Sequence, residues 1–290
     1  MSMASRWRVL TEEVRNVALR RLGPLAHLVG IWEGTGYTII FRPDGQHNKP
    51  FCLQQNRTIE TLTFIPLIMS VKDRGHIGQN DISLKGIIYE QLISDEHNIT
   101  DVLHFESGQW LWIPETTVPL KKDTVARQAT ILHGVSFTAT GDAPPLLPIK
   151  GKPNIITTNT TPTGPQVAEP RYLDQFHNAP LLAGLPEGSV QDPSLILRHR
   201  MATQMVVETV TFDVAAQLSA DKEENCGISN IPFLDRNAQV TGLRSVFYVE
   251  HIEDDGGSFM QLQYIQIVPL FFDNIIWPHV SVATLKRVLL

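Results

Sequence analysis

Two residues that can exchange protons, His104 and Glu106, stand two positions apart in the segment Leu103–Leu111. Successive side chains of a β-strand point to opposite faces, so these two share one face. If that face is internal, the imidazole and the carboxylate can act together as general acid and base. The segment favours a plainer interpretation, in which Glu106 and Ser107 bond backbone groups at an edge turn around Gly108.

Two further histidines are candidates for a binding role. His133 lies in the apolar stretch ATILHGVSF, where a hydrogen-bonded core histidine is the default interpretation and a pocket role is the alternative. His279 follows Pro278, which holds the residue before it in an extended conformation. Apolar neighbours that can shield a group bound at His279 are Phe271, Phe272, Ile275, Ile276 and Trp277. The alternative is that His279 caps a helix and that Phe271 and Phe272 are structural plugs.

A basic cluster, Arg198-His199-Arg200, marks the start of a long predicted strand. Arg198 and Arg200 are candidate anchors for a ligand carboxylate, because guanidinium forks match carboxylates in geometry. A solvated strand end is the more ordinary interpretation. Cys52 and Cys226 are too few for a disulfide framework and have no metal-ligand spacing.

The elements that must position these residues are mostly strands. Runs rich in Val, Ile, Thr and aromatic residues recur, several of them with a period of two, and turn residues separate them. The predicted strands are Gly30–Phe41, Phe51–Phe64, Ile82–Ile93, Asp101–Ile113, Ala126–Thr140, Asn154–Thr160, Leu195–Val214, Thr241–Ile252 and Ser258–Leu270. Helical patterns between these strands are missing, which argues against repeated βαβ units.

The pattern favours an all-β fold, a single antiparallel up-and-down barrel of the calycin type with about 10 strands. Residues 1–290 then form one domain, closed by pairing of the strand near Gly30–Phe41 with the strand near Ser258–Leu270. A helix is predicted over residues 9–22, within an N-terminal helical extension over 1–25, because apolar residues recur there at helical spacing.

Residues 141–194 differ from the rest of the chain. They contain ten of the 19 prolines, together with stretches rich in Thr and Asn. Strand-like sequence resumes afterwards without an independent start signal, so we interpret the segment as a long excursion from one barrel rather than as a domain linker. Long loops of this kind often act as lids or binding loops.

Charge and hydropathy exclude some classes of partner. The net charge of −6 and the lack of a basic stripe argue against nucleic-acid binding. No apolar run is long enough for a membrane-spanning helix, and the first residues lack the apolar core of a secretory signal. We therefore expect a cytoplasmic protein.

Three stretches resemble a known family. Gly30, Trp32, Gly34 and Gly36 form the pattern G-x-W-x-G-x-G in the first strand. The segment Leu103–Leu111 reads LHFESGQWL, and the C-terminus combines LQYIQIVPL with WPHVSVATLKRV. Together these stretches, in this order, resemble the nitrobindins, which are small haem-binding β-barrels.

The resemblance implies that His279 is the axial ligand of a ferric b-type haem, in a loop that precedes a short C-terminal helix. Trp32, Gly34 and Gly36 would belong to the cofactor-binding end, and Arg198 and Arg200 would pair with the haem propionates. An inward His104–Glu106 pair would act on an oxidant bound to the haem. Any activity would then be of the isomerase or peroxidase kind, with nitric oxide or peroxynitrite.

Two other functions remain open at the level of sequence. One is a carrier of a fatty acid or another hydrophobic molecule, without haem and with a carboxylate anchor. The other is a cofactor-free barrel enzyme that uses Glu106, His104 or His133 on a hydrophobic metabolite. A homodimer is compatible with each of these functions.

Overall fold

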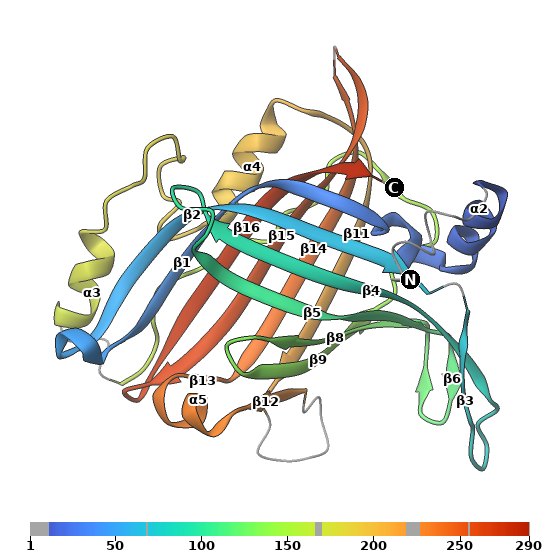
Figure 1. The fold of residues 1–290 in the computed structure, drawn as a ribbon, viewed down its shortest axis with the longest axis horizontal. Coiled ribbons are helices and arrows are strands. Elements are labelled where there is room, and N and C mark those ends of the chain that lie inside the picture. The colour runs from blue at the N-terminus through green and yellow to red at the C-terminus, as the bar shows by residue number, and fades with distance from the viewer. Residues whose placement is uncertain (1–11, 68, 166–169, 219–226, 255, 290) are drawn as a thin grey trace.

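Ten of the strands in the computed structural model close into one antiparallel barrel (Figure 1). The structure describes residues 12–289, except 68, 166–169, 219–226 and 255. The neighbours around the barrel are β11, β14, β15, β16, β1, β2, β4, β5, β8 and β9, and the ring closes where Ala215 of β11 pairs with Thr140 of β9. In chain order these strands are β1 Gly30–Asp44, β2 Lys49–Pro66, β4 Ile82–Asp95, β5 Val102–Ile113, β8 Thr124–Ile131, β9 Val135–Asp142, β11 Met205–Gln217, β14 Gly242–Asp254, β15 Gly257–Phe272 and β16 Ile275–Leu289.

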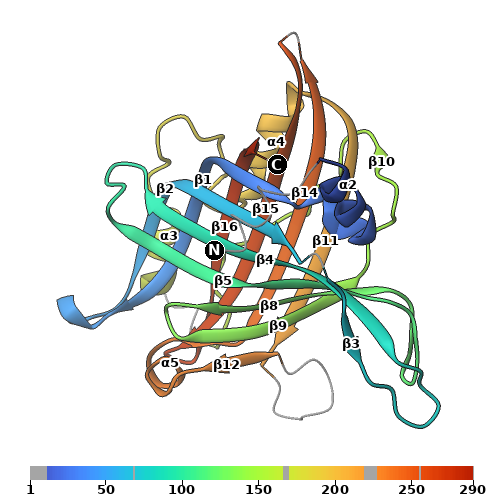
Figure 2. The same ribbon diagram turned by 45° about the vertical axis from the view of Figure 1, so that its right-hand side comes forward.

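Short helices and short strands accompany the ten barrel strands (Figure 2). The helices are α2 Glu12–Arg21, η1 Gly23–His27, η2 Gly45–His47, α3 Pro170–His177, α4 Ser194–Ala202 and α5 Pro232–Asn237. The short strands are β3 Val71–Asp73, β6 Thr116–Thr117, β7 Leu120–Lys121, β10 Ile149–Lys150, β12 Ile228–Asn230 and β13 Gln239–Val240. In the part of the chain that the structure describes, no helix has the length and apolar character needed to cross a membrane.

The all-β barrel predicted from the sequence is confirmed, and most predicted strands lie within observed ones. The N-terminal helix is confirmed over Glu12–Arg21, while the start of its predicted range lies outside the described residues.

Three strand predictions were wrong. Residues 126–140 are not one strand but two, β8 and β9, because Gly134 adopts a positive φ of 103° and the chain reverses there. Residues 154–160 form no strand. Residues 194–202 form helix α4 before strand β11 begins at Met205, so the basic cluster at Arg198 lies on a helix.

The predicted C-terminal helix was also wrong, because residues 275–289 form strand β16. Its LKRVL ending suits a helix locally, but β15 and β1 both pair with it along most of its length. The predicted pairing of the first strand with Ser258–Leu270 is corrected for the same reason. Strand β16 inserts between β15 and β1, so the first strand pairs with β16 and not with β15.

The connection from β9 to β11 runs along the outside of the barrel (Figure 1). The backbone amide of Ile156 donates to the Tyr248 hydroxyl on β14 (3.0 Å). The side chain of Gln55 on β2 donates to the Pro180 carbonyl (3.1 Å). Residues of the connection therefore cover the outer faces of two separate strands.

One end of the barrel is closed by helix η1. Leu25 and Leu28 are fully buried, and the indole of Trp32 donates to the Leu28 carbonyl (2.7 Å). The Arg287 guanidinium lies over the same indole, 5.3 Å from its centroid. Trp32 is itself fully buried, and it anchors this end of the core.

Replacing Trp32 by a smaller side chain should lower the free energy of unfolding. We expect Trp32→Ala to lower the free energy of unfolding by about 3–5 kcal/mol, because a large buried side chain is lost and a cavity remains. Glu33→Ala, at an exposed position of the same strand, should change it by less than about 0.5 kcal/mol. Urea unfolding followed by circular dichroism measures both. Equal effects of the two substitutions would contradict the buried role of Trp32.

A carboxyl group lies buried on the outer face of the barrel, on the strands that helix α4 covers. Glu250 of β14 is fully buried, and its Oε2 accepts a hydrogen bond from Gln261 of β15 (2.6 Å). Gln261 in turn bonds Gln204, just after α4, and the neighbouring Gln263 donates to the Leu197 carbonyl of that helix (3.4 Å). Oε1 of Glu250 has no partner among the described residues. Burial raises the Glu250 pKa from 4.5 to about 7.

This raised pKa predicts a pH-dependent stability. The folded protein holds the Glu250 proton more tightly than the unfolded chain does, so the free energy of unfolding falls as the pH rises from about 4.5 to about 7. The expected loss is about 3 kcal/mol, and it persists above that range. In Glu250→Gln this part of the loss should disappear. Urea unfolding of both proteins at pH 5 and pH 8 tests this, and an identical pH dependence would contradict it.

Candidate functional site

A buried ion pair lies at the centre of the barrel. Arg127 of β8 donates to Glu106 Oε1 of β5 over 2.6 Å, and both side chains are fully buried. The Tyr89 hydroxyl of β4 also donates to Glu106 and accepts from Arg127 Nε (2.8 Å). On the far side, Arg127 donates to Ser245 (2.7 Å) and Gln266 (2.8 Å). Residues of four other strands thus converge on the guanidinium of Arg127.

Electrostatics hold this pair ionised. Burial opposes the charge on Glu106, but Arg127, His104 and Tyr89 stabilise it and lower its pKa to about 2. The charge of Glu106 in turn raises the pKa of Arg127 despite its burial. A carboxylate with so low a pKa is a weak base at neutral pH, so Glu106 is suited to orienting a partner rather than to taking up a proton.

Aromatic rings fill the space around the ion pair. The Arg127 guanidinium lies 5.2–5.9 Å from the ring centroids of Tyr89, Trp110, Phe137 and Phe247. Phe247 also stacks on Tyr264, with centroids 5.5 Å apart. Because these side chains are buried and in mutual contact, the centre of the barrel is packed protein.

A second polar network crosses the barrel beside the first. The Tyr264 hydroxyl donates to Glu60 (2.6 Å) and accepts from Gln91 (3.0 Å), while Thr58 donates to the other oxygen of Glu60 (2.7 Å). Burial raises the Glu60 pKa although these hydrogen bonds oppose the rise. A side chain at Gly36 would collide with Glu60, since a Cβ there would lie 2.4 Å from its Oε1. Gly36 therefore makes room for this carboxyl.

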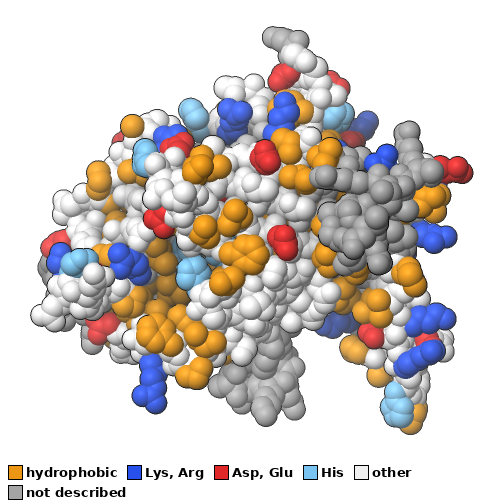
Figure 3. All heavy atoms as spheres, viewed as in Figure 1, with side chains coloured by type: hydrophobic (Ala, Val, Ile, Leu, Met, Phe, Trp, Pro, Cys, Tyr) orange, Lys and Arg blue, Asp and Glu red, His pale blue; other side chains and the backbone are white. Residues whose placement is uncertain are grey.

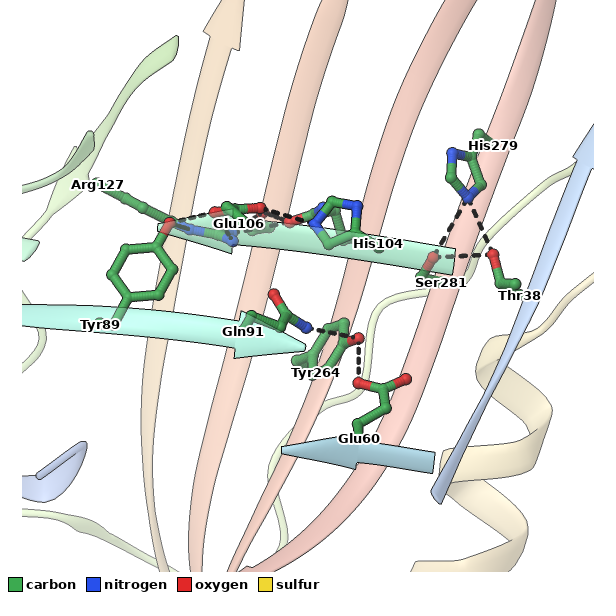
Figure 4. A network of polar contacts seen from close by, with 12 residues as sticks. Thr38, Glu60, Tyr89, Gln91, His104, Glu106, Arg127, Tyr264, His279 and Ser281 are labelled. Carbon is green, nitrogen blue, oxygen red and sulfur yellow. Dashed lines mark hydrogen bonds and ion pairs between the residues drawn. The ribbon is translucent and has the colours of Figure 1, made fainter. Parts of the chain in front are cut away.

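His279 lies on strand β16 and faces the barrel interior (Figure 4). Its Nε2 is 2.9 Å from the Thr38 hydroxyl and 3.4 Å from that of Ser281. Burial, with help from the charges of His104 and His133, lowers the His279 pKa to about 3, so the imidazole is neutral at neutral pH. Its Nδ1 has no hydrogen-bond partner among the described residues. The contacts of Nε2 therefore orient the His279 ring, and Nδ1 is left without a hydrogen-bond partner among the described residues.

His104 and His133 lie at the same end of the barrel. The ring of His104 on β5 is 6.0 Å from that of His133, which is exposed in the β8–β9 turn. His104 Nε2 lies 3.2 Å from Glu106 Oε2, and its side chain is 13% exposed. We call this end, lined by His104, His133 and His279, the mouth. Figure 3 shows the surface hollowed left of centre, with hydrophobic side chains on the floor and a histidine beside it.

Other predicted site residues lie away from the mouth. Trp32 pairs with Arg287, which is eight residues beyond His279 on β16, or about 26 Å along the strand. Gly34 allows close contact with β16, since a Cβ there would lie 2.2 Å from the Thr284 carbonyl oxygen. Trp32 and Gly34 therefore shape the barrel rather than surround a group at His279.

The two arginines predicted as carboxylate anchors lie on α4, outside the barrel. Arg198 donates to Asp192 (3.2 Å), to the Ile155 carbonyl (3.2 Å) and to Thr157 (2.8 Å). These contacts fasten the β9–β11 connection to the helix. Arg200 is exposed. Their placement gives no support to a role in binding a ligand inside the barrel.

Sequence reasoning missed the residues that organise the interior. Arg127, Tyr89, Glu60 and Tyr264 were not selected, although each sits on an inward face defined by alternation. Arg127 occupies the same face as Val125 and Ala129, which are buried. A charged residue in phase with buried apolar neighbours was the signal that could have revealed it.

The fold is a closed ten-stranded antiparallel barrel, consistent with a calycin-like fold, and a barrel of this kind can hold a ligand. No protein-family model matches the chain, and no curated protein is significantly similar to it. What this barrel binds must therefore be argued from its own residues.

The buried ion pair predicts strong energetic coupling. Arg127→Met leaves the Glu106 carboxylate buried without its cation and should lower the free energy of unfolding by about 3–5 kcal/mol. Glu106→Gln should be costly for the reciprocal reason. The double variant should lose clearly less than the sum of the two, because it buries neither charge. Urea unfolding of all four proteins measures the coupling, and simple additivity would contradict the pair's role.

Proposed function

We propose that this barrel binds a small ligand at its mouth, and that the ligand is a b-type haem held by His279. One observation carries the proposal: His279 presents a neutral imidazole whose Nδ1 has no partner among the described residues, while hydroxyls hold its Nε2. Axial ligands need a neutral imidazole that is fixed through its second nitrogen. The three nitrobindin-like stretches, the last of which contains this histidine, support the same group.

The proposal gives the residues around His279 separate roles in holding the bound group. In this proposal the Thr38 and Ser281 hydroxyls accept the Nε2 hydrogen, which leaves the lone pair of Nδ1 for the bound group. Apolar residues stand close to the histidine in the sequence, with Ile275 and Trp277 buried and Phe271 and Ile276 partly exposed. Haem, when bound, would supply reactivity toward nitric oxide or peroxynitrite, as the family resemblance implies.

The packed centre favours the mouth over a deep site. A fatty-acid carrier would need a cation for the carboxylate, but Arg127 is already paired with Glu106. Glu106 is enclosed and has a pKa of about 2, so it is poorly suited as the base of a cofactor-free enzyme. These contacts support haem binding at the mouth over the two other functions.

Hemin titration tests the proposal directly. We expect wild-type protein to develop a shifted Soret band, and His279→Ala to lose it while its far-ultraviolet circular dichroism stays unchanged. His199→Ala, in the exposed part of α4, is the matched control and should behave as wild type. If wild type and His279→Ala bind hemin equally, His279 is a structural residue and the proposal is wrong.

The hydroxyl that orients the ring gives a second test. Thr38→Val keeps the shape of the side chain but removes the nearer of the two hydroxyl partners of Nε2. We expect it to weaken hemin binding about tenfold or more, because partners of a metal ligand usually contribute that much to affinity. Unchanged affinity would show that His279 needs no orienting contact from Thr38.

A further inference from the structure

Two β-hairpins project from the barrel at the end that helix η1 closes (Figure 1). One contains β3 and the start of β4, and the other consists of β6 and β7, between barrel strands β5 and β8. The backbone amides of Thr117 and Val118 both donate to Gln79 Oε1, over 2.7 and 3.1 Å. The two turns are therefore fastened to each other. We call this pair of hairpins, residues 71–84 and 115–123, the arm.

The tip of the arm carries large apolar side chains in water. Ile77 is 84% exposed, Val118 59% and Leu120 79%. Exposed apolar side chains that gather in one place mark a surface that contacts another protein or a membrane. Because the hydrogen bonds between the turns hold this tip in a defined shape, its exposure is a built feature of the fold.

Positive charge gathers on the side of the barrel that carries α2 and the arm. Over residues 12–21, 71–85 and 115–123 there are eight lysines and arginines against six acids, although the whole chain has a net charge of −6. Figure 3 shows lysine and arginine side chains beside hydrophobic ones on this projection. An apolar tip with cations around it is complementary to an anionic lipid surface.

A pocket of about 480 Å³ lies between the end of α2 and the root of the arm. Its lining consists of Arg21, Leu22, Leu67, Met69, Ser70 and Lys85. Two cations thus share the pocket with three apolar side chains, and no acid lines it among the described residues. Lys85 Nζ lies 4.1 Å from the centroid of the Trp112 ring, which holds this cation in place. The pocket therefore suits a ligand with an anionic head and an apolar body.

We propose that this side of the barrel docks on a membrane surface, with the headgroup phosphate of an anionic phospholipid bound between Arg21 and Lys85. The apolar tip of the arm enters the lipid layer beside it. This docking surface is separate from the proposed haem site. The arm precedes strand β8 and His133 of the mouth follows it, so the two sites lie at opposite ends of the barrel.

The arm and the pocket together favour a lipid layer over a free anion or a protein partner. A free phosphate would engage Arg21 and Lys85 but would leave the apolar tip in water. A protein partner of fixed shape would have to enclose a projecting tip, whereas a lipid layer deforms around it. Each cation beside an anionic bilayer contributes about fivefold to affinity, and burial of an Ile or Leu side chain contributes about tenfold or more.

Co-sedimentation of the full chain with lipid vesicles tests the role of the pocket. We expect wild-type protein to bind vesicles that contain phosphatidylcholine and phosphatidylserine in equal amounts, and to bind pure phosphatidylcholine about tenfold or more weakly. Arg21→Gln combined with Lys85→Gln should weaken binding to the mixed vesicles about tenfold or more, because both partners of the phosphate are lost. Arg200→Gln combined with Arg236→Gln removes the same charge from exposed positions on α4 and α5 and should match wild type.

A second pair of variants tests the insertion of the tip. Ile77→Ser combined with Leu120→Ser should weaken binding to the mixed vesicles about tenfold or more, with an unchanged circular dichroism spectrum. The matched control is Ile99→Ser combined with Leu132→Ser. These two residues are 66% and 73% exposed in the β4–β5 and β8–β9 turns, at the other end of the barrel, and their replacement should have no effect.

Three outcomes would overturn the proposal. The first is a wild-type protein that does not sediment with the mixed vesicles, which would leave the apolar tip to a protein partner. The second is equal vesicle binding by wild type and by Arg21→Gln with Lys85→Gln. The third is a pocket that binds inorganic phosphate in calorimetry while the tip variant keeps its full vesicle binding, which would mean a soluble anion as the ligand. None of these measurements involves hemin, so the haem site and this surface stand or fall separately.

Discussion

The buried ion pair between Glu106 and Arg127 is the constraint on which the rest of the structure depends. Two charges removed from water are tolerated only when they pair closely and their remaining hydrogen-bonding groups are satisfied. The barrel meets this condition with Tyr89, Ser245 and Gln266, brought from three further strands. The aromatic rings that enclose Arg127 then fill the centre. A barrel built in this way has a packed centre.

One end is closed and the other presents histidines. Helix η1 and Trp32 close the first end. At the other end, His104 is 13% exposed and contacts Glu106 of the central ion pair. The contacts that make a buried arginine tolerable therefore also orient an imidazole at the mouth.

The sequence predicted the barrel and its first strands, because period-two alternation and the glycine-spaced first strand are local signals. It mistook β16 for a loop and a helix, since LKRVL has helical propensity and only pairing with β15 and β1 overrides it. The sequence selected His279, His104 and Glu106. It could not reveal Arg127 as their partner, because residues 21 positions apart in the chain meet only through strand register.

The central claim is that the ligand lies at the mouth beside His279 and that the barrel centre stays closed. Nitrogen-15 NMR of the histidine rings and tryptophan indoles, recorded with and without ferric hemin, tests it most directly. The account predicts a neutral His279 with its hydrogen on Nε2 in the protein alone. On addition of hemin, the paramagnetic iron should broaden the signals of His279 and His104 and leave the Trp32 indole unchanged. Broadening of Trp32 with an unaffected His279 would contradict the account.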